Sequence, residues 1–326
     1  MSCQGSKRVA VISGDGIGPE VIESALGVLE AAGVDIEEVP VEIGFGKWKR
    51  TGKAMSDEDM DEIKDCRCVL LGAITTPHDP NYKSVLLRLR KELDLYANIR
   101  PFSKKGLDMV IVRENTEGLY SGLEEITDDE ARTVRVITRR GSQRIALKAC
   151  ELAARRRKLT IVHKANVLHS DRLFLGTCRV VAESSGVQYD DMLVDAAAYN
   201  LVVRPEKFDV MVTTNLFGDI LSDEAAGVLG SLGLCASANL GERYALFEPI
   251  HGSAPDIAGK GVANPIGAIR SAAMMMDWFG EADKARRIEE AVVWSLDQGI
   301  TTPDMAGCYK TRKVTEAIAN YLREMA

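Results

Sequence analysis

Two carboxylates with a spacing of four residues are the first sign of chemistry in this sequence. Asp219 and Asp223 lie in the stretch Asn215–Gly227, whose pattern predicts the start of a helix. This spacing puts both side chains on one helical face. Hard divalent cations such as Mg²⁺ or Mn²⁺ prefer carboxylate oxygens. The alternative is that acids in a first helical turn only complement the helix dipole, and the spacing alone does not choose between the two.

The surrounding pattern predicts an α/β protein in which polar residues follow strand ends. Short apolar runs alternate with helical patterns along the chain, as in α/β folds. Arg113, Lys164 and Asp195 each stand where a predicted strand gives way to a loop or helix, the usual place for functional residues in such folds. We expect strands at 7–13, 68–72, 132–138, 159–164, 189–194 and 208–214, and a strand from 109 that runs into a polar loop. We expect helices at 20–32, 84–96, 142–158, 265–279, 283–298 and 311–324, a helix that opens at 56–59 and a helix that begins within 215–227.

A glycine-rich turn follows the first predicted strand. The sequence Gly14-Asp-Gly-Ile-Gly-Pro19 suggests a dinucleotide fingerprint, but Pro19 stands in the place of the third glycine and suits the first turn of a helix. An ordinary Rossmann phosphate loop is therefore not expected. We interpret the segment as a tight turn that brings backbone near a ligand.

Two further segments invite a binding role. Leu86 and Leu87 lie four and three residues before Arg90 on a predicted helix, so an apolar pair flanks a cation. Such a surface could receive a ligand with a branched alkyl group and a carboxylate; the alternative is an ordinary amphipathic helix facing the core. The loop Leu246–Pro265 is long and rich in glycine and proline, and loops of this length are usually functional.

Composition excludes several other classes of protein. A chain of 326 residues fits two domains. Its net charge of −7 argues against nucleic-acid binding, and no apolar run approaches the ~20 residues of a membrane helix. Seven cysteines without a C-x-x-C pair suggest neither disulfides nor zinc. With no signal-peptide pattern at the N-terminus, we expect a cytoplasmic protein with neither nucleic acid nor membrane as partner.

Six motifs in order make the chain resemble the β-decarboxylating dehydrogenases, the family of isopropylmalate, isocitrate and homoisocitrate dehydrogenases. The resemblance covers nearly the whole length. The motifs are Gly14-Asp-Gly-Ile-Gly-Pro-Glu20, Leu93-Asp-Leu-Tyr-Ala-Asn-Ile-Arg-Pro101, Val112-Arg-Glu-Asn-Thr-Glu-Gly-Leu-Tyr120, His163-Lys-Ala-Asn-Val167, Asn215–Gly227 and Glu248–Pro265.

The resemblance implies the isocitrate/isopropylmalate dehydrogenase-like two-domain α/β fold, which is not a standard Rossmann domain. Residues 1–95 and 230–326 would form a first domain with both termini and the cofactor loop. Residues 96–229 would form a second domain with the metal, substrate and dimer contacts. The family also implies a homodimer, possibly a tetramer, in which each active site borrows residues from the partner subunit.

The resemblance also assigns roles to individual residues. Arg90, Arg100 and Arg113 would hold the carboxylates of a malate-like substrate, as guanidinium forks do well. Asp219 and Asp223, with Asp195 from the other subunit, would hold Mg²⁺ or Mn²⁺. Lys164, also from the partner and positioned with help from Asp195, would take the hydroxyl proton, and Tyr120 would protonate the enol. Catalytic residues are thus Tyr120, Lys164 and Asp195, and the substrate contacts are Ser84, Leu86, Leu87, Arg90, Arg100, Arg113 and Asn166.

In this family the loop from Glu248 to Asn264 holds the adenosine half of the cofactor. Asp256 implies NAD in preference to NADP, because a carboxylate accepts hydrogen bonds from a ribose 2′-OH but repels a 2′-phosphate. The expected cofactor contacts are Glu248, His251, Gly252, Ser253, Ala254, Asp256 and Asn264.

The paired leucines favour 3-isopropylmalate, which gives 2-oxoisocaproate in leucine biosynthesis. Leu86 and Leu87 offer dry contacts to an isopropyl group and no partner to a third carboxylate. Isocitrate and homoisocitrate stay as alternatives, because Ser84 and the loop Glu114–Glu117 resemble enzymes for those substrates, and Lys83 or Arg88 could reach a distal carboxylate. A non-catalytic regulatory subunit, or a binding protein for a di-acid, is disfavoured because all of the expected catalytic and metal residues are present.

Overall fold

The computed structural model describes residues 7–104 and 106–325, which form two compact units. Unit 1 contains the residues up to Leu89, Gly230–Ala238 and the residues from Arg243 onward, and unit 2 contains Arg90–Leu229 and Asn239–Glu242. The units therefore divide within helix α4 (Val85–Glu92) and within strand β11 (Ala236–Leu240). We expected the domains to divide between residues 95 and 96 and between residues 229 and 230, and these limits remain a prediction.

The strands of unit 1 form a parallel arrangement in the order β2-β1-β3-β12. All six residues of β3 are buried, because helices cover both faces of a parallel sheet and its strands are therefore continuous apolar runs. The strands are β1 (Arg8–Gly14), β2 (Glu37–Pro40), β3 (Cys68–Ala73) and β12 (Ala245–Pro249).

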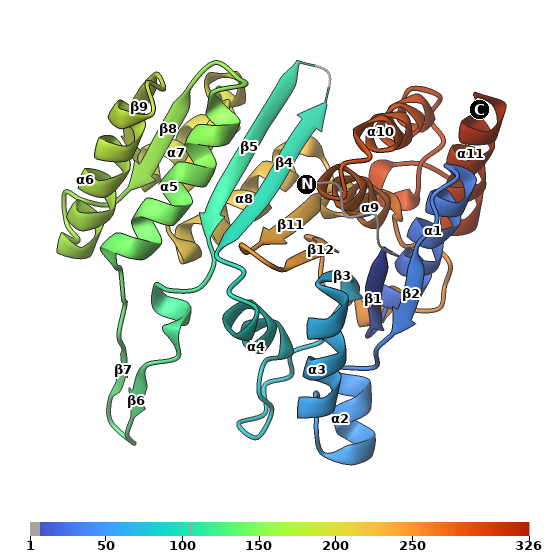
Figure 1. Cartoon of the computed structure of the whole chain (residues 1–326), viewed down its shortest axis with the longest axis horizontal. Helices are drawn as coiled ribbons and strands as arrows, with labels where there is room; N and C mark the ends of the chain where they lie inside the picture. The colour runs from blue at the N-terminus through green and yellow to red at the C-terminus, as the bar shows by residue number, and fades with distance from the viewer. Residues whose placement is uncertain (1–6, 105, 326) are drawn as a thin grey trace. The chain divides into compact units, whose positions relative to one another are not determined.

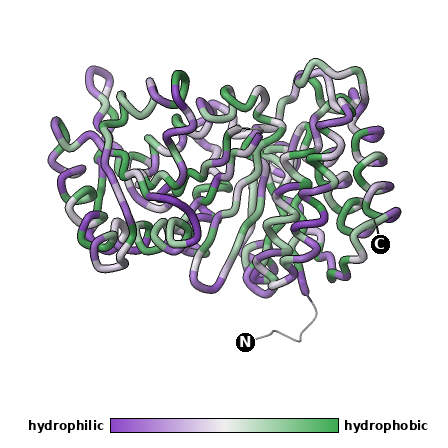
Figure 2. Tube along the Cα trace, turned by 90° about the horizontal axis from the view of Figure 1, so that it is seen from above, coloured by the Kyte–Doolittle hydropathy of each residue, from purple (hydrophilic) through white to green (hydrophobic). Residues whose placement is uncertain are grey.

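The helices of unit 1 surround these strands, with α1 against both α9 and α11 (Figure 1). Their traces alternate between hydrophilic and hydrophobic residues (Figure 2), as expected for helices with one buried face. Ser56 is the N-cap of α3: its hydroxyl accepts from the Asp59 N–H, which confirms the predicted helix start. The helices are α1 (Gly18–Ala31), α2 (Phe45–Thr51), α3 (Asp57–Cys66), α9 (Ile266–Trp278), α10 (Ala282–Asp297) and α11 (Thr311–Glu324), with short 3-10 turns at Leu232–Leu234, Pro255–Ile257 and Pro303–Met305.

The strands of unit 2 have the order β4-β5-β10-β8-β9. The hairpin partners β4 and β5 are antiparallel, and the other neighbours are parallel. The strands are β4 (Ala97–Lys104), β5 (Leu107–Glu114), β8 (Leu159–His163), β9 (Tyr189–Leu193) and β10 (Val210–Thr213). The helices are α5 (Arg139–Ala153), α6 (His169–Ser184), α7 (Val194–Val203) and α8 (Asn215–Leu229), with 3-10 turns at Leu119–Ser121 and Pro205–Lys207.

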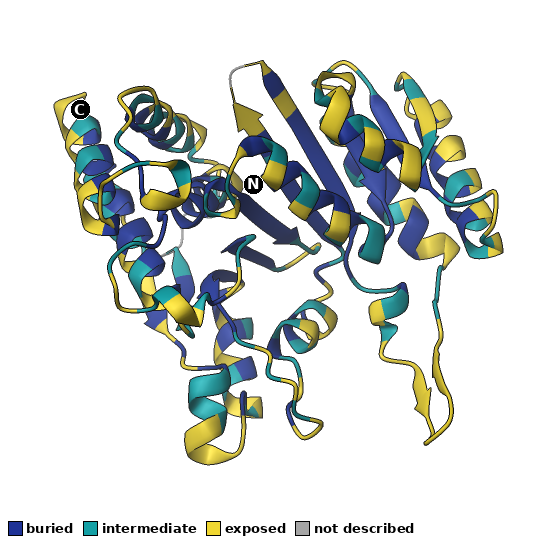
Figure 3. Ribbon diagram, turned by 180° about the vertical axis from the view of Figure 1, so that it is seen from behind, coloured by how far each residue is buried: buried dark blue, intermediate teal, exposed yellow. Residues whose placement is uncertain are grey.

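Two expected elements of unit 2 have different limits in the structure. The strand predicted at 132–138 was wrong over most of its length: only β7 (Ala131–Thr133) pairs with β6 (Glu124–Ile126), in an exposed hairpin (Figure 3). Apolar and polar residues alternate in this segment, but neither of its faces is buried. The helix predicted from Ser142 begins earlier, because the Thr138 hydroxyl caps it at the Gly141 N–H.

No helix in the described ranges 7–104 and 106–325 is long and apolar enough to cross a membrane.

Candidate active site

The parallel strands of unit 2 bring the predicted polar residues to one edge of the sheet. The carboxyl ends of β5, β10, β8 and β9 point the same way, and ligands bind at this edge in open α/β sheets. Arg113 lies at the end of β5, and Asp219 lies in the helix that follows β10. Lys164 follows β8, and Asp195 is in the first turn after β9. The strand-end prediction is thus confirmed for the placement of these residues.

Arg113 and Asp219 form the centre of the first cluster. The Arg113 side chain is buried, and its guanidinium makes an ion pair with the Asp219 carboxylate. The same guanidinium donates to the side-chain Oδ1 of Asn215 from Nε at 3.1 Å and from Nη2 at 2.7 Å. Gly218 makes room for it, because a Cβ there would come within 2.6 Å of the Arg113 stem. Asn215 therefore holds Arg113 in place, a role that we did not predict.

Arg100 and Arg90 complete a group of three guanidinium groups. Arg100 is also buried; its Nε donates to Asn98 Oδ1 at 2.6 Å, and its Nη1 lies 3.5 Å from Asp219. Burial and the positive charges of Arg100 and Arg90 together lower the pKa of Arg113. Three positive charges lie close enough here to affect one another, so the cluster suits an anionic ligand with more than one carboxylate.

Tyr120 also contacts Asp219. Its hydroxyl donates to the second Asp219 oxygen at 3.1 Å. Burial and the Asp219 charge raise the pKa of the Tyr120 phenol, so this side chain carries its proton at neutral pH. A protonated hydroxyl at this position can act as a proton donor.

The two carboxylates of α8 differ in their pKa. Burial alone would raise the pKa of Asp219, but Arg113, Arg100 and the Tyr120 hydrogen bond outweigh it, so the pKa is lowered. Burial raises the pKa of Asp223, because Asp223 receives less compensation from the same arginines. Within the described parts of the chain, no three His, Cys, Asp or Glu side chains gather closely enough to hold a metal ion.

Lys164 and Asp195 form a second cluster at the same edge. The Lys164 Nζ lies 2.5 Å from the Asp195 carboxylate, and both side chains are partly exposed. The Lys164 backbone N–H donates to Asp171 at 2.6 Å, and Asp171 is fully buried beside Arg135. The sequence contained no signal for this role of Asp171, which fixes the backbone of the predicted base.

The substrate residues expected on α4 occupy its first turns. The Ser84 hydroxyl accepts from the Leu87 N–H at 3.4 Å, so Ser84 caps the helix. Leu86 is half-buried, and Leu87 is 41% exposed. Arg88 is bound by Asp57 at 2.5 Å and also donates to the Met55 and Ser56 carbonyls. Asn166, expected as a further substrate contact, is exposed in the turn after β8.

The predicted cofactor loop lies entirely in unit 1. The His251 Nδ1 lies 3.0 Å from the Gly252 carbonyl, while its Nε2 is buried with no hydrogen-bond partner among the described residues. Burial lowers the pKa of His251, so the neutral ring presents Nε2 as an acceptor. A buried acceptor without a partner needs a donor such as an exocyclic amine. This residue therefore fits the adenine of a dinucleotide.

The other expected cofactor residues of this loop differ in exposure and backbone conformation. Asp256 is exposed in the 3-10 turn Pro255–Ile257, where its carboxylate can meet a ribose hydroxyl. Ala254 has a φ of 37°, a conformation that side chains rarely adopt and that clusters at functional sites. Glu248 and Ser253 are buried, and Gly252 is exposed.

Asn264 makes hydrogen bonds within the protein that we did not predict. Its Nδ2 donates to Asp304 at 3.0 Å, and its Oδ1 accepts from the Ile266 N–H at 3.1 Å. Asp304 also contacts the Ser231 hydroxyl. Asn264 is thus fixed at the start of α9 before any ligand binds.

Comparisons with known proteins agree with this geometry. Residues 8–318 match the isocitrate/isopropylmalate dehydrogenase family. The chain is 46% identical to a homoisocitrate dehydrogenase of Methanocaldococcus jannaschii, over 97% of this chain and 98% of that protein. It is 45% identical to a 3-isopropylmalate dehydrogenase of Archaeoglobus fulgidus, over 97% and 99%. The solved isocitrate dehydrogenase of Methylococcus capsulatus has a TM-score of 0.93 and 45% identity, over 97% of this chain and 99% of that one.

Three relatives with three different substrate names therefore lie at nearly equal identity, so identity supports the family and does not choose a substrate. The fold expected from the sequence motifs is confirmed, since nearly the whole chain matches the family and superimposes on one of its members. The chain belongs to the isocitrate/isopropylmalate dehydrogenase family of β-decarboxylating dehydrogenases, which use NAD(P) and a divalent metal.

Proposed function

We propose that the chain catalyses the NAD-linked, metal-dependent oxidative decarboxylation of 3-isopropylmalate to 2-oxoisocaproate, a step of leucine biosynthesis. The observation that carries the choice of substrate is the surface of α4 before Arg90. Leu87 is 41% exposed there, so it is not a core residue and is available to an alkyl group. Covering an isopropyl group contributes roughly 0.8 kcal/mol for each buried carbon.

The neighbouring cation supports the same choice. Lys83 and Arg88 were the candidates for reading a third carboxylate, and Asp57 and two backbone carbonyls hold the Arg88 guanidinium. Releasing it would break an ion pair with the exposed Asp57 carboxylate, which contributes about 0–1 kcal/mol, and two hydrogen bonds to backbone carbonyls. A tricarboxylate such as isocitrate or homoisocitrate would therefore meet a less favourable surface than 3-isopropylmalate.

In the proposed mechanism, Arg90, Arg100 and Arg113 bind and orient the two substrate carboxylates. Lys164, as the neutral amine, removes the proton from the C2 hydroxyl, and Asp195 positions the Lys164 side chain. After carbon dioxide leaves from the C3 carboxylate, Tyr120 donates the proton that C3 requires. NAD, held by the loop Glu248–Asn264, would supply the hydride acceptor for C2, and a divalent cation, held by Asp219, Asp223 and Asp195 from the other subunit, would supply positive charge against developing negative charge.

The proposal includes a homodimer with shared sites, and the ion pairs Lys164–Asp195 and Arg113–Asp219 have no residue in common. Lys164 and Asp195 of one subunit would complete the site formed by Arg113, Tyr120 and Asp219 of the other. We also propose a cytoplasmic location, which suits buried cysteines that remain thiols.

The test is NADH formation with Mg²⁺ and 3-isopropylmalate, isocitrate or homoisocitrate, measured in parallel. We expect kcat/KM for 3-isopropylmalate to lead by tenfold or more, which corresponds to about 1.4 kcal/mol. A lead for either tricarboxylate would refute the assignment of substrate and leave the family unaffected. No NADH with any of the three would refute the enzyme proposal itself.

A further inference from the structure

The Asp15 side chain in the glycine-rich turn organises three segments of unit 1. Its carboxylate accepts backbone N–H groups from Phe45 at 2.9 Å, Gly46 at 2.8 Å and Thr75 at 2.9 Å. Phe45 and Gly46 begin α2, and Thr75 follows β3. Three N–H donors on one carboxylate hold the Asp15 side chain and the three backbone segments in fixed positions.

Thr75 and the turn itself both contact the cofactor loop. The Thr75 hydroxyl donates to the Ser253 hydroxyl at 2.6 Å, and the Ile17 N–H donates to the Ser253 carbonyl at 2.9 Å. Gly16 has a φ of +60°, and a Cβ there would come within 1.9 Å of that same carbonyl oxygen. Only glycine permits this approach of the turn to the loop. The turn thus brings its backbone to another segment of the protein.

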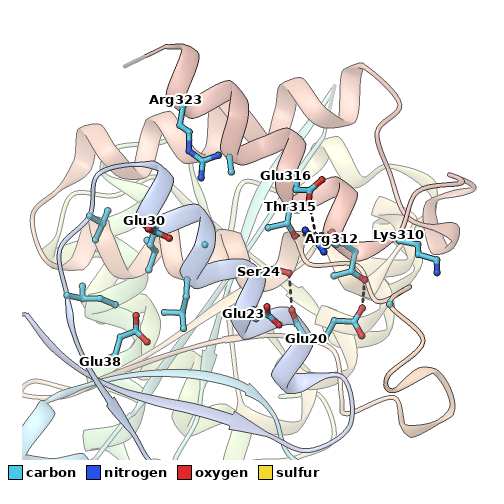
Figure 4. A pocket seen from close by; sticks show the side chains of 18 of the residues that line it. Glu20, Glu23, Ser24, Glu30, Glu38, Lys310, Arg312, Thr315, Glu316 and Arg323 are labelled. Atoms are coloured by element: carbon cyan, nitrogen blue, oxygen red, sulfur yellow. Dashed lines mark hydrogen bonds and ion pairs between the residues drawn. The ribbon is translucent and has the colours of Figure 1, made fainter.

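Glu20, at the end of the same motif, reaches the other end of the cofactor loop. Its carboxylate accepts the Ala263 N–H at 3.3 Å and contacts the Thr311 hydroxyl, which lies 2.6 Å from the Ala263 carbonyl oxygen. Figure 4 shows Glu20 extending from α1 toward the start of α11, at the side of a groove of about 870 Å³. Ala263 immediately precedes Asn264, an expected adenine contact.

We propose that the segment Gly14–Glu20 is a clamp that positions the cofactor loop at both ends, with Asp15 and Glu20 as its positioning residues. Asp15 acts through Thr75 on Ser253, and Glu20 acts on Ala263 beside Asn264. The clamp rests on the proposed function, in which this loop binds NAD. It gives the motif a task other than phosphate binding, because its polar groups are directed at protein segments.

The test uses direct NADH binding by fluorescence titration of the full-length protein without metal or substrate, together with steady-state kinetics. The central pair is Thr75→Val, which removes only the hydroxyl that meets Ser253, and Thr75→Ser, which keeps it. We expect Thr75→Val and Glu20→Gln each to raise the Kd for NADH and the KM for NAD by about fivefold or more. Thr75→Ser should restore both constants, and the KM for 3-isopropylmalate should stay within about twofold.

The matched control is Asp59→Asn. Asp59 also accepts a backbone N–H, that of Ser56, and pairs with Lys47 of α2, yet it contacts no part of the cofactor loop in these interactions. The Asp59→Asn substitution should lower the unfolding temperature and leave the Kd for NADH unchanged. Asp15→Asn tests the centre of the network, and the threonine pair keeps the inference testable if that variant does not fold.

Two results would overturn the clamp. One is wild-type affinity for NADH in Thr75→Val and Glu20→Gln. The other is an equal loss of affinity in Asp59→Asn, which would show a general loss of stability. A wild-type protein that binds no NADH would instead overturn the proposed function, and the clamp with it.

Discussion

The Lys164 ammonium group lies 2.5 Å from the Asp195 carboxylate, at the ends of the neighbouring strands β8 and β9. The ion pair of Arg113 and Asp219 stands at the ends of β5 and β10 instead. The groups that would bind the substrate and the group that would take its proton thus belong to separate clusters of one chain. A two-fold dimer that places one cluster of each subunit against the other cluster of its partner would complete two identical sites.

Lys164→Met should lower kcat by about 10²–10⁴-fold, the usual contribution of a general base, and leave the Kd for NADH unchanged. Stopped-flow and steady-state assays at saturating substrate would measure the loss. Lys158→Met is the matched control, because Lys158 also pairs with an aspartate, Asp190, at 3.0 Å from the other end of β8. Turnover of Lys164→Met equal to that of the control would exclude Lys164 as the base.

Mixing two inactive variants should restore activity if the sites are shared. Lys164→Met and Asp219→Asn each disable both sites of their own homodimer. After unfolding and refolding together, half of the dimers would be mixed, and each would contain one intact site, so about a quarter of wild-type activity should return. Recovery is measured against each variant refolded alone. If Lys164 and Asp219 of one chain served the same site, mixing would restore no activity.

The positions of Arg113, Lys164, Asp195 and Asp219 could be predicted because strand ends are visible in the sequence as the limits of apolar runs. Parallel strands then bring those ends to one edge. The limits of the exposed hairpin β6–β7 could not be predicted in the same way, since no buried face gave its residues a period.

The groups that hold the site residues could not be predicted, because their partners are distant in sequence. Asn215 is bound by an arginine 102 positions away, and Asp304 holds Asn264 from 40 positions away. An asparagine or aspartate looks the same in the sequence whether it caps a helix, binds a ligand or supports another side chain. The loop Glu114–Glu117 illustrates this: we weighed it as a substrate element, yet Glu114 is buried and accepts the N–H groups of Thr116 and Glu117.

Leu87→Arg should shift specificity toward tricarboxylates. A guanidinium at this exposed position would attract a third carboxylate and remove the dry contact of an isopropyl group. We expect the ratio of kcat/KM for homoisocitrate to that for 3-isopropylmalate to rise by about tenfold or more. Leu147→Arg on α5 is the control, because Leu147 is 45% exposed and Leu87 is 41% exposed. An unchanged ratio would place Leu87 outside the substrate pocket.

Asp256→Asn should relax the choice of cofactor. The asparagine keeps the size of the side chain and removes the negative charge that would repel a 2′-phosphate. The ratio of kcat/KM for NADP to that for NAD should rise by about tenfold, mostly through KM. Asp297→Asn removes an equally exposed charge of unit 1 at the end of α10 and should leave the ratio as it is. A rise of the same size in both variants would reflect net charge and not the ribose contact.

Asp209→Asn should weaken the fold in a pH-dependent way. The buried Asp209 carboxylate accepts the backbone N–H groups of Arg157 at 2.5 Å and Lys158 at 3.0 Å, and a guanidinium N–H of Arg156 at 3.0 Å. Burial would raise the pKa of Asp209, but these donors outweigh it and lower the pKa. A carboxylate with a lowered folded pKa stabilises the protein above its unfolded value of about 3.9, and this stabilisation is lost as the pH falls through the folded pKa.

The free energy of unfolding of Asp209→Asn should therefore be lower than that of the wild type by about 1–3 kcal/mol at neutral pH, because buried N–H donors lose a charged acceptor. The difference should narrow as the pH falls below about 3.9, because the unfolded carboxylate takes up a proton there while the folded one keeps its charge until a lower pH. Urea unfolding at a series of pH values measures both quantities. Asp190→Asn provides the comparison, since Asp190 meets Lys158 at the surface and such pairs contribute about 0–1 kcal/mol. A difference that stays constant down to low pH would mean that shape at position 209, and not charge, stabilises the turn between α5 and β8.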